Sequence, residues 1–382
     1  MAVNDIAQAW GVTTMISMIA AASSCFWHVP IDLPLPETNV VYLRGDFQLK
    51  HGQRLAMEGE FPHARHMGIN IHALPTNAAL ASVIDQDMEP IPGHANPFRS
   101  GVDRDAEDRS WRLEVDPMAP KGHGHGIIGL GQNAAGEFAG RVLLRIYLPD
   151  AQHPGGGIAM PRVSRIDALG TEEPLGQKCP ETANLPRPQE PGPTGLPAAP
   201  GDFSNPLDWR GSATPAGADF ADLFVNRDNS YAYSMIDFAL GETLLLKGKA
   251  PKTSATREGA QYVADGDVRY WSICAYRFPS DRTANCLADE DIPLDPAGNY
   301  TIVVAPTESR PTNARFECGI AFLPAANSAQ GGLLLRHVVP DPDFRHTPLN
   351  VPSGADASDV LGPYEPGGRY LSRVEVEAKG CR

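Results

Sequence analysis

The sequence predicts an all-β protein made of two homologous antiparallel β-sandwich domains of jelly-roll type, with little helix. Three observations predict this fold class: a repeat that runs along the chain, short β-branched and aromatic segments in each copy, and an excess of turn residues. The 382 residues include 37 glycines and 36 prolines, while charged residues make up only 20%. This composition is typical of many short strands joined by turns.

The repeat is the strongest of these observations. The matching blocks follow the same order in both copies: 47–62 with 238–251, 64–69 with 268–273, 85–88 with 289–292, 111–117 with 300–306, 143–150 with 334–341, and 164–167 with 372–375. The offset between the copies is 189 at Gly59/Gly248, 204 at Arg65/Arg269 and 191 at Arg145/Arg336. Each change of offset marks an insertion with loop-like composition, at 96–109 in the first copy and 252–266 in the second.

The repeat therefore defines the domains. We expect one β-sandwich at 36–179 and a second at 218–382, from an internal duplication, joined by a linker rich in Pro and Gly at 180–217. The matched segments 111–115 and 300–304 are typical strands, and about eight strands per copy suit a sandwich. After residue 35 helical periodicity is weak, although residues 216–225 can form one short helix.

The amino-terminal segment, residues 1–30, resembles an export signal. No formal charge lies between Asp5 and Asp32, and residues 15–22 have the length of a signal-peptide core. No Lys or Arg precedes this core, so a membrane anchor or a buried helix stays open as an alternative. Cys25 also loosely resembles a lipoprotein acylation site. We expect an exported protein (periplasmic, cell-surface or secreted), with membrane attachment through this segment only.

The six cysteines favour disulfides over a structural metal. They form no C-x-x-C pair and no zinc-finger spacing, and an even number in an exported chain is typical of disulfide bonding. Cys274 and Cys286 enclose a short polar stretch and are placed to close a hairpin. Cys318 and Cys381 both lie in the last third of the chain, where a bridge between them ties down the last strand.

Composition and motifs also exclude some functions. The formal net charge of −14 at pH 7 argues against a nucleic-acid partner, because the phosphate backbone is itself anionic. The sequence contains no G-x-S-x-G elbow, no Walker loop and no H-E-x-x-H motif. Several other short motifs are present: 269–273, 300–304, 322–324 and 334–336 in the second copy, and Asn39, 61–67 and 96–98 in the first.

Together these motifs resemble a bacterial and fungal family called domain of unknown function 1214. The resemblance covers most of residues 36–380, and it places the chain nearer to a group of uncharacterised exported proteins than to the centre of the family. It implies paired β-sandwich domains and brings no activity for particular residues.

The first copy holds a candidate catalytic set. Eight of the eleven histidines precede residue 130, and His63 and His66 lie on one predicted strand. Asp85 and Asp87 form a carboxylate cluster that recurs in the second copy at 289–291. Such groups suit general acid–base catalysis or Ca²⁺ binding, and the alternative is a solvated turn that caps backbone groups.

A second histidine pair is a candidate metal site. His123 and His125 are two residues apart, which places both imidazoles on one face of a strand. With a carboxylate they can bind Zn²⁺, Cu²⁺ or non-haem iron, and no other cofactor is expected. The alternative is a pair of solvated or core-edge histidines.

Arg65 and Arg269 are the most interesting charged pair, since they occupy the same strand position in both copies. A half-buried arginine needs a partner. One alternative is a carboxylate of the sandwich, Asp87 or Asp291, and the other is an anionic ligand held by two hydrogen bonds.

The leading hypothesis is an exported two-domain protein that binds a small molecule or glycan in a cleft between its domains. Its expected ligand-binding residues are Arg65, Arg269, Tyr270, Trp271, Asn39 and Asn229. The alternative is a hydrolase or lyase that uses His63, His66, Asp85 and Asp87, with or without a divalent metal at His123 and His125.

Overall fold

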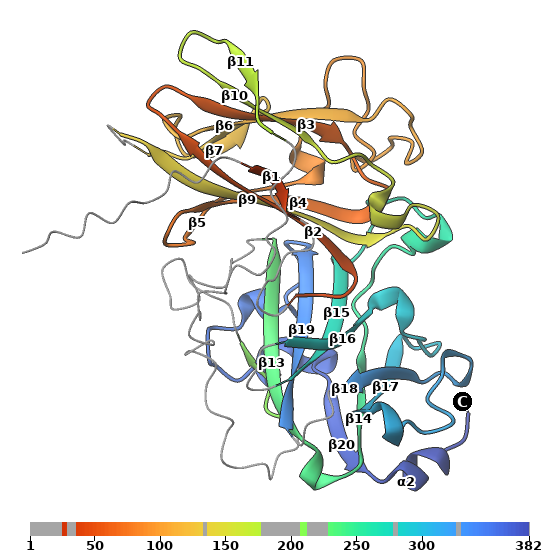
Figure 1. The fold of residues 1–382 in the computed structure, drawn as a ribbon. Helices are drawn as coiled ribbons and strands as arrows, with labels where there is room; N and C mark the ends of the chain where they lie inside the picture. Colours follow the sequence, from red (N-terminus) through yellow and green to blue (C-terminus); the bar gives the residue numbers. More distant parts are fainter. Residues whose placement is uncertain are drawn as a thin grey trace, which may run out of the picture.

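The computed structural model describes residues 25–28, 36–132, 136–176, 207–211, 228–277, 282–325 and 330–381. It confirms the all-β class: strands dominate, and four sheets form two lobes, which lie one above the other in Figure 1. Within these residues no helix has the length and apolarity needed to cross a membrane.

The first lobe, residues 25–176, contains two packed sheets. Its strands are β1 (Cys25–His28), β2 (Val40–Leu49), β3 (Arg54–Glu60), β4 (Ala64–Ala73), β5 (Ala79–Ile84), β6 (Ser110–Asp116), β7 (Gly122–Gly124), β8 (Ile127–Gly129), β9 (Phe138–Pro149), β10 (Arg162–Ile166) and β11 (Glu172–Pro174). The sheet orders are β1-β2-β9-β4-β5 and β11-β10-β3-β6-β8-β7. Strand β6 alternates between buried and half-buried residues, as a strand with one wet face does. Strand β4 is buried from Ala64 to His72, because the second lobe covers its outer face.

The second lobe, residues 207–381, repeats this plan. Its strands are β12 (Arg210–Gly211), β13 (Asn229–Asp237), β14 (Thr243–Lys249), β15 (Val268–Arg277), β16 (Arg282–Ala288), β17 (Asn299–Pro306), β18 (Ala321–Ala325), β19 (Gln330–Pro340) and β20 (Gly367–Leu371). The sheet orders are β12-β13-β19-β15-β16 and β18-β17-β14-β20. Two short helices, α1 (Ser358–Leu361) and α2 (Arg373–Glu377), lie near the carboxyl end.

The two lobes agree in register as well as in strand order. Tyr42 of β2 is opposite Arg145 of β9, and Tyr231 of β13 is opposite Arg336 of β19. Each lobe also has one parallel pair, β6 with β8 and β17 with β18, within otherwise antiparallel sheets. Arg145 and Arg336 are positions that the sequence repeat aligns, so this agreement supports the hypothesis of a duplication. The common origin of the lobes stays a prediction.

Both lobes extend beyond the boundaries predicted for them. Strand β1 falls inside the predicted segment 1–30, yet Phe26 and Trp27 are buried in the core of the first lobe. Strand β12 falls inside the predicted linker, and Trp209 next to it is buried in the core of the second lobe. The rest of these segments lies outside the described residues: 1–24, 29–35, 177–206 and 212–227, which include the predicted helix and Cys179.

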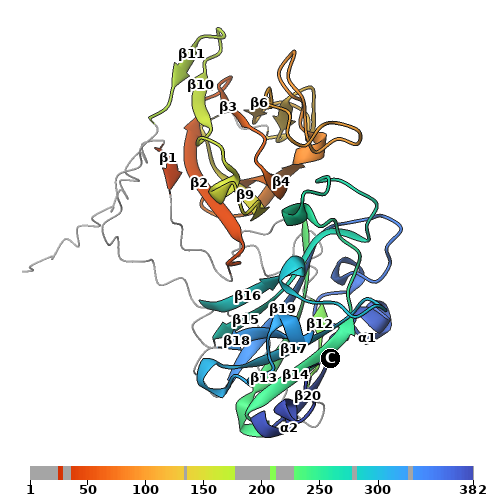
Figure 2. The same ribbon diagram turned by 90° about the vertical axis from the view of Figure 1, so that its right-hand side faces the viewer.

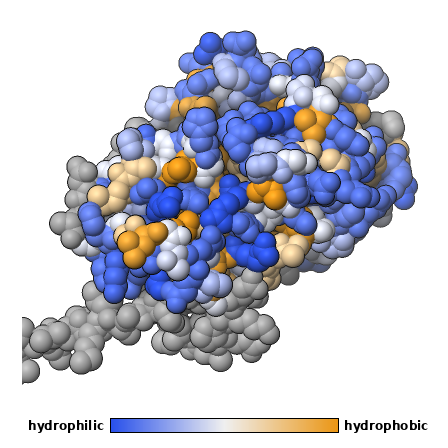
Figure 3. Space-filling model, turned by 90° about the horizontal axis from the view of Figure 1, so that it is seen from above, coloured by the Kyte–Doolittle hydropathy of each residue, from blue (hydrophilic) through white to orange (hydrophobic). Residues whose placement is uncertain are grey.

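Two disulfides confirm the predicted cysteine pairs. Cys274 and Cys286 face each other across β15 and β16, and Cys318 is bonded to Cys381. Between the lobes lies a third apolar cluster to which both contribute: Val40, Tyr147, Leu148, Tyr270, Ala288 and Val338. Figure 2 shows the lobes meeting through the sheet that contains β4 and the sheet that contains β15. The outer face of the first lobe is mainly hydrophilic, with apolar residues scattered over it (Figure 3).

Candidate functional site

The boundary between the lobes is organised by the two equivalent arginines. Arg65 of β4 extends into the second lobe, where its Nη1 lies 2.7 Å from Asp289 Oδ2 and its Nη2 contacts Glu290. The acceptors belong to a 3₁₀ turn, η6 (Asp289–Asp291). The Arg65 side chain is fully buried.

Arg269 of β15 makes the reciprocal contact. Its Nη2 donates to Gln86 Oε1 at 2.6 Å, and its Nη1 lies 3.4 Å from Asp85 Oδ1. These acceptors belong to the equivalent turn of the first lobe, η1 (Asp85–Asp87). Each lobe therefore inserts one arginine into a turn of the other lobe.

This arrangement corrects the predicted arginine partners. Asp87 is exposed, and Asp291 pairs instead with Arg257. The first carboxylate of each turn, Asp85 or Asp289, is buried and faces the other lobe, because a 3₁₀ turn directs its first and third side chains differently. Both arginines thus make contacts between the lobes.

The two insertions meet at this boundary. Tyr262, from the insertion in the second copy, is fully buried in the core of the first lobe, and its ring stacks on Phe98 with centroids 4.9 Å apart. The Arg104 guanidinium lies 4.4 Å above the Tyr262 ring, and both side chains hydrogen-bond Asp150 Oδ2, at 2.5 and 2.9 Å. Thr256 accepts a 2.8 Å hydrogen bond from Arg65 Nε.

The predicted catalytic residues are not brought together. His66 Nδ1 lies 2.9 Å from Asp85 Oδ2, but both side chains are completely buried, so no substrate reaches them. Burial opposes ionisation of Asp85, yet His66 and Arg269 outweigh it and hold the pKa of Asp85 below its usual value. His63 precedes β4 and Asp87 is exposed on η1. Of the four residues, only His66 and Asp85 interact.

His63 lies in a separate basic group. Its ring stacks on His153 with centroids 4.0 Å apart, and its Nε2 lies 2.9 Å from Arg109 Nη1. Burial, together with Arg109 and His153, lowers the pKa of His63 to about 4. The His63 imidazole is therefore neutral at pH 7 and accepts a hydrogen bond from Arg109.

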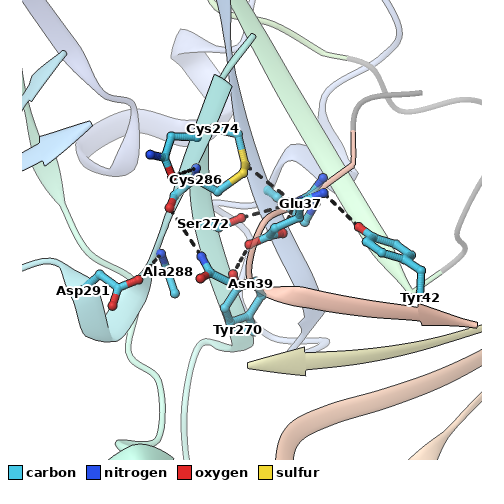
Figure 4. The surroundings of a disulfide bond; sticks show 11 residues. Glu37, Asn39, Tyr42, Tyr270, Ser272, Cys274, Cys286, Ala288 and Asp291 are labelled. Atoms are coloured by element: carbon cyan, nitrogen blue, oxygen red, sulfur yellow. Dashed lines mark hydrogen bonds and ion pairs between the residues drawn. A yellow bond between two sulfur atoms is a disulfide. The ribbon is translucent and has the colours of Figure 1, made fainter. Parts of the chain in front are cut away.

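The other predicted ligand-binding residues lie in or near the packed boundary. Trp271 is in the core of the second lobe, beside Tyr300. The Tyr270 hydroxyl donates to Glu37, which enters the second lobe over the Cys274–Cys286 disulfide (Figure 4). Asn39 Nδ2 lies 3.5 Å from the Cys286 carbonyl oxygen. At another place in the boundary, the Asn229 amide donates to the hydroxyls of Tyr147 and Tyr231, each at 2.9 Å.

The predicted metal-binding pair does not share a strand face. His123 lies in β7, but His125 lies in the following turn with φ 51°, and both are exposed. Among the described residues, the metal-type side chains that converge are Glu37, Cys274 and Cys286. Their two sulfurs are already joined in a disulfide, so this group does not fit a metal ion.

One pocket opens where the lobes meet. Its volume is about 160 Å³. Its lining includes Gln86 of the first lobe and Arg269 of the second, together with the insertion in the second copy. The lining residues are Gln86, Ser254, Tyr262, Val263, Ala264, Gly266, Val268, Arg269, Val339, Pro340, Asp341 and Pro342. Arg269 is the only predicted site residue among them.

Sequence reasoning missed Gln86, Tyr262 and Asp341. A signal existed for Asp341, since the dipeptide Pro340-Asp341 repeats Pro149-Asp150. Tyr262 carried no signal, because an insertion without a counterpart cannot be interpreted through the repeat. Gln86 occupies the position of Glu290 in the second copy. This difference matters because Arg269 contacts the neutral Gln86, whereas Arg65 contacts the carboxylate of Glu290, and the sequence does not show these contacts.

Comparisons with known proteins give the fold alone. No family model and no curated protein matches the chain. A crystal structure of an uncharacterised protein from Burkholderia cenocepacia is similar at 10% identity, covering 92% of this chain and 82% of that one, with a TM-score of 0.52. A structural-genomics target from Vibrio parahaemolyticus aligns over 91% of each chain at 12% identity, with a TM-score of 0.48.

Proposed function

We propose that this is an exported binding protein that takes a small anionic molecule in the pocket between its lobes, with Arg269 as the principal contact. The observation that carries the proposal is that the two equivalent arginines, Arg65 and Arg269, face different numbers of carboxylates. Arg65 faces two carboxylates, Asp289 and Glu290. Arg269 has one carboxylate, Asp85, at 3.4 Å, and its shorter contact is to the neutral amide of Gln86.

The carboxylate of Asp85 is also heavily shared. Besides Arg269 it accepts hydrogen bonds from the Met67 backbone N–H at 2.7 Å and from the Gln86 backbone N–H at 2.7 Å, and it contacts His66. A guanidinium has five N–H donors, of which these contacts engage two. A buried cation that is under-compensated and lines a pocket is suited to an anionic ligand.

The size of the pocket favours a small molecule over a glycan. Pockets for drug-sized ligands span about 300–1,000 Å³, whereas this one has about 160 Å³. A carboxylic acid of a few carbon atoms suits that volume, and an oligosaccharide does not. Apolar residues such as Val268 and Val339 line the remaining wall.

Export is supported by the two disulfides. Such bonds persist in oxidising compartments and are rare in the cytosol. The hydrolase or lyase alternative receives no comparable support, because His66 and Asp85 are sealed from solvent and His63 lies apart from them.

Calorimetric titration of the oxidised full-length chain with sodium acetate and with inorganic phosphate tests the proposal. We expect saturable binding at one site for at least one of these anions, and loss of binding in Arg269→Gln. The matched control is Arg112→Gln, which removes an arginine on the outer face of β6 that does not line the pocket. Arg269→Lys keeps the charge and checks that any loss is not due to misfolding. Equal binding by wild type and Arg269→Gln, or no binding of either anion, refutes the proposal.

A further inference from the structure

We infer that the ligand of this pocket is a small zwitterion of the α-amino-acid type, with its carboxylate at Arg269 and its ammonium group at Asp341. This inference rests on the proposed function and adds the second charge. The inference comes from comparing the pocket of the second lobe with the equivalent position in the first lobe. In the first lobe the protein's own side chains fill that position, whereas in the second lobe it is open.

The two places correspond residue by residue. Pro149 is opposite Ala64 in the first lobe, and Pro340 is opposite Val268 in the second. The next residue of each strand, Asp150 or Asp341, makes the same backbone bond: Asp150 N to the His63 carbonyl at 3.0 Å, and Asp341 N to the Asp267 carbonyl at 2.9 Å. Asp150 and Asp341 are therefore equivalent, as Arg65 and Arg269 are.

In the first lobe, groups from the insertions satisfy both members of this pair. Asp150 accepts from the Arg104 guanidinium and from the Tyr262 hydroxyl. Arg65 has the Thr256 hydroxyl in addition to its two carboxylates. In the first lobe the Asp150 carboxylate therefore has a cationic partner, and the Arg65 guanidinium has oxygen acceptors for its hydrogen bonds.

In the second lobe both kinds of partner are missing among the described residues. Asp341 lies at the exposed rim of the pocket, where its Oδ1 accepts only the Asp343 backbone N–H, at 2.8 Å. Arg269 faces Gln86 where Arg65 faces Glu290, so it lacks one negative charge. A ligand with one carboxylate and one ammonium group supplies both missing charges.

The length of one connection explains why the space is open. The insertion reaches the first lobe because residues 250–267 connect β14 to β15. The equivalent connection of the first lobe, between β3 and β4, consists of residues 61–63 and is too short to extend across. The β3–β4 connection therefore brings no group to Asp341, and among the described residues Arg269 contacts the first lobe through Asp85 and Gln86.

The test compares ligands that carry one charge or both. Isothermal titration of the oxidised full-length protein uses L-alanine, propionate, N-acetyl-L-alanine and ethylamine. We expect alanine to bind about tenfold more tightly than propionate or N-acetylalanine, because a second charge-assisted hydrogen bond is formed. Ethylamine, which lacks the carboxylate, is expected to bind least.

Variants assign the ammonium contact. Asp341→Asn removes the charge but keeps the oxygen that accepts from Asp343 N, so the loop is preserved and the preference for alanine over propionate should disappear. Asp343→Asn, an exposed neighbour, is the matched control and should keep the preference. Propionate binding as tightly as alanine, or a preference that survives Asp341→Asn, overturns the zwitterion and leaves the anion site standing. Absence of binding by every carboxylate overturns both.

Discussion

Removal of Arg65 is the sharpest test of how the lobes are held together. The change is Arg65→Met, which keeps most of the aliphatic volume and deletes the guanidinium. Two carboxylates then lose the guanidinium that faces them inside the protein, where the side chains of Asp289 and Glu290 are only 4% and 12% exposed. Breaking a buried ion pair from one side costs about 3–5 kcal/mol. We expect a loss of that size in the free energy of unfolding.

The matched control is Arg112→Met. Arg112 contacts three carboxylates, Glu58, Glu114 and Glu172, but its side chain is 29% exposed on the outer sheet. Water replaces the lost contacts there, and the expected loss is below about 1 kcal/mol. By the number of ion pairs alone, Arg112 would be expected to stabilise the protein more than Arg65. The comparison therefore isolates the effect of burial.

Equilibrium urea unfolding of the oxidised protein provides the measurement. Hydrogen exchange read by mass spectrometry adds the location, and in Arg65→Met we expect faster exchange in β4 and β15 than in β6 and β17. The reasoning is refuted if Arg65→Met costs no more than Arg112→Met. It is also refuted if the extra exchange appears away from the boundary.

Three further predictions concern burial, pH and cross-linking. Tyr262→Ala should lower the free energy of unfolding by about 3–5 kcal/mol, because it empties a fully buried site in the core of the first lobe. Tyr262→Phe should lower it by only about 1 kcal/mol, because it removes only the hydrogen bond to Asp150. Equal losses would contradict the view that burial of the Tyr262 ring stabilises the boundary. Burial lowers the pKa of His337 from 6.5 to about 3, so the unfolded chain binds a proton that the folded chain does not, and roughly 5 kcal/mol of stability is lost as pH falls from about 6.5 to 3. His337→Gln should lack this loss, so its stability relative to wild type should rise steadily over that range in urea titrations. Replacing Cys318 and Cys381 with Ala should lower the unfolding free energy by about 4 kcal/mol, against about 3 kcal/mol for Cys274 and Cys286, because the loops span 63 and 12 residues; the reverse order in urea melts argues against a chain-entropy origin.

The sequence was a good guide to what each copy repeats. The offsets at Arg65 and Arg145 correspond to the strand registers of the structure, because pairing with period two fixes which residues face each other. Both predicted disulfides are present for a similar reason, since Cys274 and Cys286 lie on neighbouring strands.

The sequence did not predict the contacts between the two lobes. The repeat predicts partners for Arg65 and Arg269 within one sandwich, but each partner lies in the opposite lobe. Matching one copy to the other does not show how the two lobes pack together. The two insertions have loop-like composition, yet their residues Arg104 and Tyr262 are buried at the boundary between the lobes. Their role depends on a contact between segments more than 150 residues apart, which no local pattern encodes.

Under the proposed function, the unequal lengths of the β3–β4 and β14–β15 connections also predict how many ligands bind. A molecule with two equivalent lobes is expected to bind two ligands, but here the first lobe's place is permanently taken by Arg104 and Tyr262 of the same chain. The protein should therefore bind one ligand per chain. The first lobe, whose equivalent position is filled by its own side chains, serves as an internal comparison for the second. Arg104→Ala, which leaves the residues lining the proposed pocket unchanged, should then uncover a second, weaker site that appears as a second step in the binding curve.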